Sequence, residues 1–401
     1  MTDVAIVGGG LAGGLIALAL YRKHPELHIA VIESGGALGG NHRWSWFESD
    51  LSAEGHDLLS TLKQDEWNKG YDVIFPRHRR TLSAGYRSMQ SSDFHEGITQ
   101  ALPKDALLLG RSAQQLDAGG VTLSDGERIE ARTVIDCRPF ASSTHLNGGW
   151  QVFMGRHIRL DRPHGMDRPI IMDGAVDQHA PHGNGGAFRF VYTLPLGTHD
   201  VFVEDTYYAD TPQLDQSVLS ARIDGYCRQM GWDAGTTIGS ESGLLPVITG
   251  GDFTAHQAET SIAGVVAAGA RGGFVHPLTS YTLPTAVQNA LIIADSAELS
   301  GPELAAKFEV RAREHWRSMG YYRALGRTLF NAARPHERYR IFQRFYGLRE
   351  PLVERFYAGR STIFDKVRIL VGRPPVAFGK ALAALLGKGA PLVQGKPDER
   401  S

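Results

Sequence analysis

Three glycines near the start of the chain have the spacing of a phosphate-binding turn. Gly8, Gly10 and Gly13 follow the pattern Gly-x-Gly-x-x-Gly, between an apolar strand expected over residues 1–7 and an apolar helix expected over residues 11–21. In such a turn the first glycine allows the tight bend, the second lets the backbone approach a pyrophosphate, and the third lets helix and strand pack closely. The helix directs free backbone N–H groups at the phosphates. The segment therefore predicts a bound dinucleotide.

The surroundings of this turn indicate which dinucleotide it is. The N–H groups of Leu11 and Ala12 begin the helix, and Glu33 ends a second strand expected over residues 28–32, where its carboxylate can accept hydrogen bonds from an adenosine ribose. Four more glycines follow at once, at positions 35, 36, 39 and 40. An N-terminal motif with this continuation is typical of proteins that bury FAD in an extended form. We therefore expect FAD, with NAD as the alternative because the motif alone does not distinguish them.

A second glycine run lies far along the chain, before another expected long helix. Gly269, Arg271, Gly272 and Gly273 belong to it, and its backbone amides would lie where a flavin or a pyrophosphate can sit. Flavin hydroxylases usually carry an acid just after the first glycine, whereas this chain has Ala270 or Arg271 there. The ordinary hydroxylase interpretation is therefore weakened. Arg271 is expected either to face the pyrophosphate or to cap the loop.

Acidic side chains in apolar strands are the candidates for proton chemistry. Glu204 and Asp205 are adjacent in a strand expected over residues 200–208, so their side chains point to opposite faces of the sheet. Glu204 follows an apolar stretch, where burial would raise its pKa and keep it protonated. The alternative from context alone is an ordinary acid of an edge strand. Asp173 ends another apolar strand, and a turn-forming role is as well supported as a role in the site. His276 is expected either to transfer a proton or to hold its loop by hydrogen bonds.

Four segments of the chain together form a specific pattern. They are the N-terminal glycines with Glu33, His-Arg-Trp-Ser-Trp at 42–46, Phe-Val-Glu-Asp-Thr at 202–206, and Gly-Gly-Phe-Val-His-Pro-Leu-Thr-Ser-Tyr at 272–281. This pattern resembles the bacterial lycopene β-cyclase family, and the resemblance reaches to about residue 385. It implies an α/β fold with a Rossmann-like FAD-binding domain of the glutathione-reductase type, an antiparallel β substrate domain and a helical C-terminal region.

The resemblance also implies a reaction. Lycopene and other carotenoids with acyclic ends would be cyclised without net redox change, yet only with reduced FAD, for which NAD(P)H can be the reductant. Both ends of lycopene would become β-ionone rings, giving β-carotene through γ-carotene by the action of an intramolecular lyase or isomerase. A terminal alkene is protonated, a second alkene closes the ring, and a neighbouring proton leaves. Glu204 is matched as the essential acid or cation-stabilising carboxylate, with Asp205 and His276 as further catalytic candidates.

A carbocation needs electron-rich surroundings from which water is excluded. Candidate walls of an apolar tunnel are Trp44, Trp46, Phe188, Phe190, Tyr207, Tyr208 and Phe274. For any single one of them, ordinary core packing is the competing interpretation. Arg43 is assigned to the cofactor together with the glycines.

The apolar patterns predict the elements that position these groups. Helices are expected at 52–69, 93–102, 214–230 and 285–299, and at most of 303–386. Strands are expected at 71–75, 106–109, 120–123, 129–137, 151–154, 168–173, 188–196 and 262–268, and residues 41–47 are expected to form an aromatic loop. The expected domains are a discontinuous FAD-binding domain (1–70, 103–148 and 255–300), a substrate-binding domain (71–102 and 149–254), a helical membrane-associating region (301–388) and a polar tail (389–401).

Composition limits the partners of this 401-residue chain. A formal net charge of −1 argues against bulk electrostatic binding of nucleic acid, and two cysteines form neither a disulfide framework nor a metal site. No apolar run of about 18 residues could span a bilayer. The C-terminal region is basic and aromatic over 342–360 and continues in apolar segments at 367–371 and 376–386. The sequence alone favours a helical cap packed on the cofactor domain. The substrate implied by the resemblance is a C40 hydrocarbon that resides in the bilayer, so we expect this region to contact the membrane surface. The expected location is the bacterial cytoplasm, peripheral on the inner membrane, with other carotenoid-pathway enzymes as partners.

Two other functions remain open. One is an FAD-dependent aromatic hydroxylase or halogenase that uses NAD(P)H and oxygen, and the other is a flavin-binding or carotenoid-carrying protein without catalysis. The product distinguishes the first, since a cyclase product has the mass of its substrate and a hydroxylated product is heavier. A carrier would keep its function after Glu204→Gln.

Overall fold

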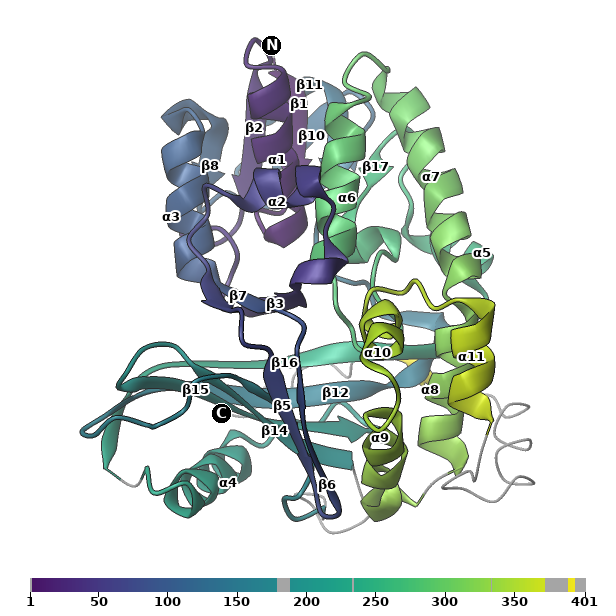
Figure 1. Ribbon diagram of the computed structural model, residues 1–401. Coiled ribbons are helices and arrows are strands. Elements are labelled where there is room, and N and C mark those ends of the chain that lie inside the picture. Colours follow the sequence, from purple (N-terminus) through teal and green to yellow (C-terminus); the bar gives the residue numbers. More distant parts are fainter. Residues whose placement is uncertain (1, 179–187, 233, 333, 372–388, 394–401) are drawn as a thin grey trace.

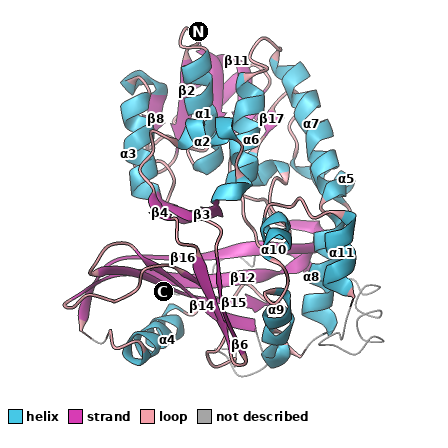
Figure 2. Ribbon diagram, viewed as in Figure 1, coloured by secondary structure: helices cyan, strands magenta, loops and turns pink. Residues whose placement is uncertain are grey.

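Two large sheets, one above the other in Figure 1, form the frame of the molecule. The computed structural model describes residues 2–178, 188–232, 234–332, 334–371 and 389–393. A small third sheet lies between the large ones, and Figure 2 shows that helices cover the upper sheet while long strands make up most of the lower part. The α/β class expected from the sequence is confirmed.

The upper sheet is built around the glycine turn. Its strand order is β8 (Leu107–Leu109), β2 (Ile29–Glu33), β1 (Thr2–Val7), β11 (Arg128–Asp136), β10 (Gly120–Leu123) and β9 (Ala113–Asp117), with β17 (Val266–Ala267) beside β11. The pairs around β1 are parallel, whereas β9, β10 and β11 form an antiparallel meander. Helix α1 (Leu11–Lys23) follows β1 directly and packs against α6 (Leu283–Ala294). The glycine turn therefore lies at the carboxyl end of the central strand, as in Rossmann-like folds.

The lower sheet is almost entirely antiparallel. Its order is β16 (Gly235–Gly251), β12 (Ser143–Leu160), β15 (Asp200–Ala209), β14 (Phe188–Pro195), β13 (Ile170–Asp173), β5 (Tyr71–Phe75) and β6 (His78–Leu82), with β18 (Ala390–Leu392) on β12. Only the pair of β13 with β5 is parallel. Helix α4 (Gln216–Gln229) packs on one face, against apolar side chains of β15 such as Val201 and Val203. The opposite face is turned toward the third sheet and the C-terminal helices.

The remaining elements join the two layers. The third sheet has the order β3 (Arg43–Phe47), β7 (Tyr86–Gln90), β4 (Asp65–Trp67). The helices beside the upper sheet are α2 (Ala53–Leu59), α3 (Ser91–Ala101), α5 (Phe253–Thr260) and α7 (Gly301–Ser318). The helices at the right of the lower sheet in Figure 1 are α8 (Gly320–Ala332), α9 (Tyr339–Phe345), α10 (Glu350–Tyr357) and α11 (Ile363–Leu370).

Several expectations for individual elements are corrected by the structure. The helix expected over 52–69 ends at Leu59, and the segment continues into β4. The aromatic loop at 41–47 contains a paired strand, β3, and β16 was not expected at all. The strand expected over 262–268 is reduced to Val266–Ala267.

The expected domain boundaries differ from the observed strand pairing. Residues 71–102 were assigned to the substrate domain, and β5 and β6 do join the lower sheet, but β7 pairs with β3 and β4. β12 already begins at Ser143, inside a segment assigned to the cofactor domain. The expected polar tail supplies β18, while the helix expected at 376–386 and residues 394–401 lie outside the described residues.

Candidate active site

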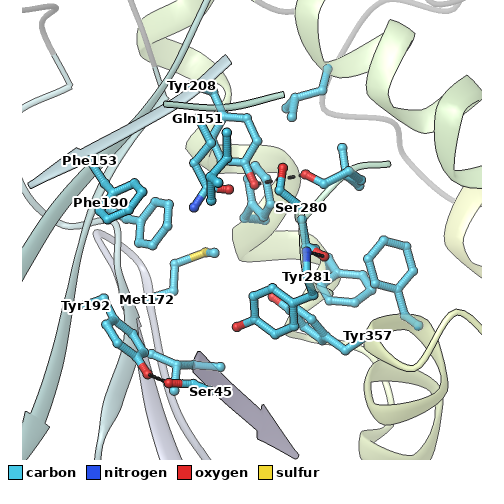
Figure 3. Close-up of a pocket in the computed structure, with 18 of the residues that line it drawn as sticks. Ser45, Gln151, Phe153, Met172, Phe190, Tyr192, Tyr208, Ser280, Tyr281 and Tyr357 are labelled. Atoms are coloured by element: carbon cyan, nitrogen blue, oxygen red, sulfur yellow. Dashed lines mark hydrogen bonds between the residues drawn. The ribbon is translucent and has the colours of Figure 1, made fainter. Parts of the chain in front are cut away.

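A cavity of about 320 Å³ lies between the lower sheet, the third sheet and the C-terminal helices. Strands β12, β13, β14, β15 and β16 provide one wall, and β3 with the loop 278–283 provides another. Side chains of α8, α9, α10 and α11 close the remaining side. Figure 3 shows apolar and aromatic side chains, among them Phe153, Phe190 and Tyr281, around this space. The apolar lining suits a hydrocarbon better than a polar substrate.

Glu204 is a carboxylic acid in this apolar wall. It lies in β15 on the face that also carries Phe202 and Tyr208, because side chains of a strand alternate. Burial raises the pKa of Glu204 to about 7, although the Thr206 hydroxyl, which donates to its Oε1 at 2.5 Å, opposes the rise. The group can therefore carry a proton near neutral pH, which is what a general acid needs.

Asp205 and Asp173 do not line the cavity. Asp205 is fully buried on the opposite face of β15, where Arg189 donates through Nε at 2.9–3.0 Å and through Nη2 at 2.5 Å. Burial raises the pKa of Asp205, and Arg189 opposes that rise. Asp173 accepts from the Tyr226 hydroxyl at 3.1 Å and from the Ala175 N–H at 3.0 Å, a turn-forming arrangement. The sequence predicted a catalytic role for Asp205, but the structure places it in a buried ion pair outside the cavity.

His276 also lies outside the cavity wall. Its Nδ1 accepts from the Thr279 backbone N–H at 3.3 Å and lies 3.0 Å from the Thr279 hydroxyl, and its ring contacts that of Tyr322. Burial lowers the pKa of His276 to about 3, so the imidazole stays neutral. Of the two roles expected from the sequence, this geometry corresponds to holding the loop.

The expected aromatic walls divide into two groups. Trp44, Phe190 and Tyr208 line the cavity. Four others do not, because they pack in the layers behind it: Trp46, Phe188, Tyr207 and Phe274. Phe188 lies one layer back, stacked at 4.3 Å on Phe342, which does reach the cavity.

Hydroxyl groups line one end of the cavity as a connected chain. The Tyr192 hydroxyl donates to Ser45 Oγ at 2.6 Å and lies 3.1 Å from the Tyr86 hydroxyl, and Figure 3 shows the bond to Ser45. The Tyr86 hydroxyl lies 3.4 Å from that of Tyr281. Burial raises the pKa of each of these tyrosines, so they remain neutral donors. Neutral aromatic rings offer negative faces to a cation without supplying a nucleophilic anion.

The first glycine turn has the shape that a pyrophosphate requires. Gly8 has φ +99°, and a Cβ on Gly13 would lie 2.0 Å from the Gly8 carbonyl oxygen. A Cβ on Gly10, the N-cap of α1, would meet nothing within 4 Å, and no described side chain caps this helix end. The N–H groups of Leu11 and Ala12 therefore open onto free space, which fits the phosphates of FAD.

Glu33 and the second glycine run complete this cradle. The Glu33 carboxylate accepts from Gly9 N–H at 2.8 Å and from Gly35 N–H at 2.7 Å, at the end of β2 where a ribose would lie. A Cβ on Gly269 (φ +61°) would come within 2.7 Å of Ala12 Cβ, so the two glycine runs touch. Gly272 and Gly273 continue from Gly269 through a short 3₁₀ turn.

The two arginines assigned to the cofactor are engaged by protein groups. Arg271 Nε lies 3.8 Å from an oxygen of the buried Asp136, away from the cavity. This contact joins the loop of Arg271 to the end of β11, and both expectations for Arg271 stay predictions. Arg43 does line the cavity, but its guanidinium donates to Asp65 at 2.7 Å, Ser88 at 3.2 Å and Gln90 at 3.0 Å.

Sequence reasoning missed part of the cavity wall. Glu241, Leu245 and Gln151 belong to paired segments of β16 and β12, and the helical wall comes from residues between 325 and 369. The sequence of β16 carries apolar residues mainly near its end, and its first six residues, 235–240, are exposed. The aromatic and basic composition of the C-terminal helices led to the prediction of a membrane-contacting surface, not of a cavity wall.

Among the described residues, no group of three or more His, Cys, Asp or Glu side chains could hold a metal ion. Every helix within the described ranges is too short or too polar to cross a bilayer.

The chain matches the model of one protein family, described as lycopene cyclase protein, over residues 3–383. It is 43% identical to a lycopene beta-cyclase of Pseudescherichia vulneris over 386 residues, which cover 96% of this chain and 97% of that protein. A lycopene beta-cyclase of Pantoea ananas is 39% identical over 384 residues, with coverage of 96% and 98%.

Solved structures with the same fold are more distant in sequence. A geranylgeranyl bacteriochlorophyll reductase-like protein of Thermoplasma acidophilum has a TM-score of 0.60 at 13% identity and covers 96% of this chain and 98% of its own. A p-nitrophenol 4-monooxygenase of Pseudomonas putida has a TM-score of 0.61 at 14% identity, with coverage of 93% and 99%. At these identities the likeness concerns the fold alone.

Proposed function

Because the chain belongs to the lycopene cyclase protein family, we propose that it is a lycopene β-cyclase, which closes both acyclic ends of lycopene into β-ionone rings. The enzyme thus catalyses an intramolecular cyclisation, and β-carotene forms through γ-carotene. The observation that supports this most directly is Glu204, a protonatable carboxyl group in an aromatic, apolar cavity.

The chemistry begins at Glu204. Its proton moves to the less substituted carbon of the terminal alkene. The π electrons of that alkene form the new C–H bond, which leaves a tertiary carbocation on the other carbon. The next alkene within reach supplies the electrons that close the six-membered ring. A proton then leaves the carbon beside the new cation, so that substrate and product are isomers. Because burial raises the pKa of Glu204 to about 7, a large fraction of this carboxyl group carries a proton at neutral pH.

The cavity wall protects the cation. Tyr192, Tyr208, Phe190 and Trp44 contribute aromatic rings, whose negative faces attract a positive charge. The neutral hydroxyl chain that starts at Ser45 has its hydrogen bonds within the protein, so it holds its rings without placing an anion near the cation. Exclusion of water prevents hydration of the cation, which would give an alcohol instead of a ring.

FAD fits the glycine cradle, and when bound in its reduced form it would supply negative charge beside the reacting end of the substrate. The residues that would hold it are the open N–H groups of Leu11 and Ala12, the carboxylate of Glu33, and the second glycine run beginning at Gly269. NAD(P)H is the reductant that we propose. The requirement for the reduced form is part of the same proposal.

The C-terminal helices give the proposed enzyme a route to a membrane-dissolved substrate. Ile363, Phe364, Val367, Leu370 and Val371 form one stripe on α11 and are 52–86% exposed. Exposed basic side chains surround the stripe, including Arg360 and Arg368, and Ile369 on the other side of the helix lines the cavity. An apolar stripe flanked by arginines suits the surface of an anionic bilayer.

We therefore place the protein at the inner face of the bacterial inner membrane, attached through α11, where it can meet other enzymes of carotenoid synthesis. Phe364→Ser with Val367→Ser should lower co-sedimentation with phosphatidylglycerol-containing vesicles at least tenfold. Val310→Ser, which changes a 48% exposed valine on α7, is the matched control. Unchanged sedimentation of the double variant would contradict this attachment, and a loss of dimers instead would identify a second copy of the chain as the partner.

The test of the activity uses purified protein on lycopene-loaded liposomes without oxygen, with FAD either oxidised or reduced by dithionite. Products are separated by chromatography, and their molecular masses are determined by mass spectrometry. Isomeric β-carotene that forms only with reduced FAD is the expected result. No conversion in either state, with NAD(P)H oxidation and heavier products from small aromatic substrates in air, would favour a monooxygenase instead.

A further inference from the structure

A second carboxyl group lies on the cavity wall near Glu204. Glu241 belongs to β16, on the other side of β12, and both glutamates pair with Gly155 in their registers. Directly paired residues point to the same face of a sheet, and both glutamates belong to the cavity lining. Their Cα atoms are therefore about two strand spacings, or ~10 Å, apart. The glycine at position 155 between them leaves room for the ring of Phe202.

An aromatic ring and a cation occupy the space around this pair. A Cβ on Gly155 would lie 2.3 Å from the Phe202 ring, so that ring covers the glycine. The guanidinium carbon of Arg43 lies 5.7 Å from the centroid of the same ring. The backbone N–H of Arg43 also donates to Glu241, which is only 9% exposed. The ionised form of Glu241 therefore has a partner of its own.

The two carboxyl groups titrate as a pair. Burial raises the pKa of Glu204 to about 7 and that of Glu241 to about 8, and repulsion by Glu204 contributes to the rise at Glu241. Between these values the pair holds about one proton. By these values the shared proton lies mainly on Glu241. The two one-proton forms differ by about one pKa unit, or roughly tenfold in population. Arg43 lowers the pKa of Glu241 and so stabilises the less populated form, in which Glu241 is ionised and Glu204 carries the proton. Other titratable side chains near the pair include Tyr192, which pairs with Glu204 and whose pKa is raised mainly by burial, and His42 and His157, whose pKa values are lowered mainly by burial.

We propose that Glu241 is the proton acceptor of the cyclisation and that Glu204 is its donor. The inference rests on the proposed function. The Glu204 O–H bond breaks as its proton bonds to the less substituted carbon of the terminal alkene, and the second alkene closes the ring. The C–H bond beside the new cation then breaks, its electrons become the ring double bond, and the proton bonds to the Glu241 carboxylate. The pair ends with the proton count with which it began, and transfer back to Glu204 restores the starting state.

Glu241→Gln tests this assignment, because glutamine keeps the shape and cannot accept the proton. With reduced FAD and lycopene-loaded liposomes we expect kcat to fall about 10²-fold or more, while KM changes little. The remaining product should shift from β-rings to ring isomers in which another carbon has lost the proton. The fall of wild-type kcat at low pH, where the acceptor is protonated, should disappear, whereas the fall at high pH should remain because Glu204 must still be protonated.

The controls separate this role from a structural one. Glu259→Gln changes an exposed carboxylate on α5 and should leave both kcat and the isomer ratio unchanged. Glu241→Asp keeps a carboxyl group and should recover part of the rate and the β-ring product. Equal thermal unfolding of the variants shows that they fold. Wild-type rate, pH profile and isomer ratio in Glu241→Gln would overturn the inference, while a wild type that leaves lycopene unchanged would overturn the proposed function itself.

Discussion

The two faces of β15 hold adjacent carboxylic acids in contrasting surroundings. Glu204 faces the cavity, where a threonine hydroxyl is its hydrogen-bond donor. Asp205 faces the α4 side, where Arg189 forms a buried ion pair with it. Both carboxyl groups are removed from water, but only the second has a guanidinium directly against it among the described residues. A buried acid without a counter-ion favours its protonated form, whereas a paired one is held as an ion. We therefore expect Glu204 to serve the reaction and Asp205, one residue further along the strand, to serve stability.

The sharpest test of this contrast is Glu204→Gln. The amide cannot donate a proton to the alkene, so we expect the turnover of lycopene to fall by about 10²–10⁴-fold. The free energy of unfolding should stay equal or rise, because a buried ionisable group is replaced by a neutral one of the same shape. Anaerobic turnover and denaturant unfolding measure the two effects. Wild-type turnover in this variant would remove Glu204 from the chemistry.

The opposite behaviour is expected for Asp205→Ala. Arg189 would remain buried without its partner, which costs about 3–5 kcal/mol of unfolding free energy. Turnover per folded molecule should change only a few-fold, since Asp205 does not reach the cavity. The double variant Asp205→Leu with Arg189→Met should regain most of the stability. A large loss of turnover without loss of stability would place Asp205 in the reaction after all.

The alternation of β15 was predictable because it is a local property. Two neighbours in an extended strand must point to opposite faces, so the sequence alone separated Glu204 from Asp205. The glycine turn from Gly8 to Gly13 is local as well, and strand, turn and helix appear where expected. The family resemblance, carried by such local motifs, is confirmed by the matches to the family and its members.

The rest of the cavity depends on pairings between distant segments. Glu241 faces the cavity because β16 pairs with β12 over nearly its whole length. The sequence of β16 is rich in glycine, serine and threonine, and it does not predict this register. Trp46 and Phe274 carry the same aromatic signal as Trp44, yet they pack behind the wall. Which of several aromatic residues reaches a cavity is decided by how layers pack, and that information is not local.

The pH dependence of stability offers a smaller, independent test of the cavity face. In the folded protein the pKa of Glu204 is raised from 4.5 to about 7, so the folded state keeps a proton that the unfolded chain releases. Its contribution to stability is present below pH 4.5 and is lost as the pH rises to about 7, with a slope of at most about 1.4 kcal/mol per pH unit. Subtracting the unfolding free energies of Glu204→Gln from those of the wild type across this range should isolate that slope. A flat difference would mean that Glu204 is ionised like a surface acid.

The smallest effects are expected from replacing one tyrosine by phenylalanine on each face of the lower sheet. Tyr192→Phe removes the hydroxyl that donates to Ser45 and contacts the Tyr86 hydroxyl at the cavity. Tyr207→Phe removes one that donates to the Gln213 carbonyl at 2.6 Å on the outer face. Each should lower the free energy of unfolding by about 0.5–1.5 kcal/mol. Only Tyr192→Phe should lower kcat, by a few-fold, because Tyr192 pairs with Glu204 in the sheet and its hydroxyl fixes β3 against the cavity. An equal loss of kcat in Tyr207→Phe would show that the outer face also controls the reaction, and the separation between the two faces of β15 would then hold for the carboxyl groups alone.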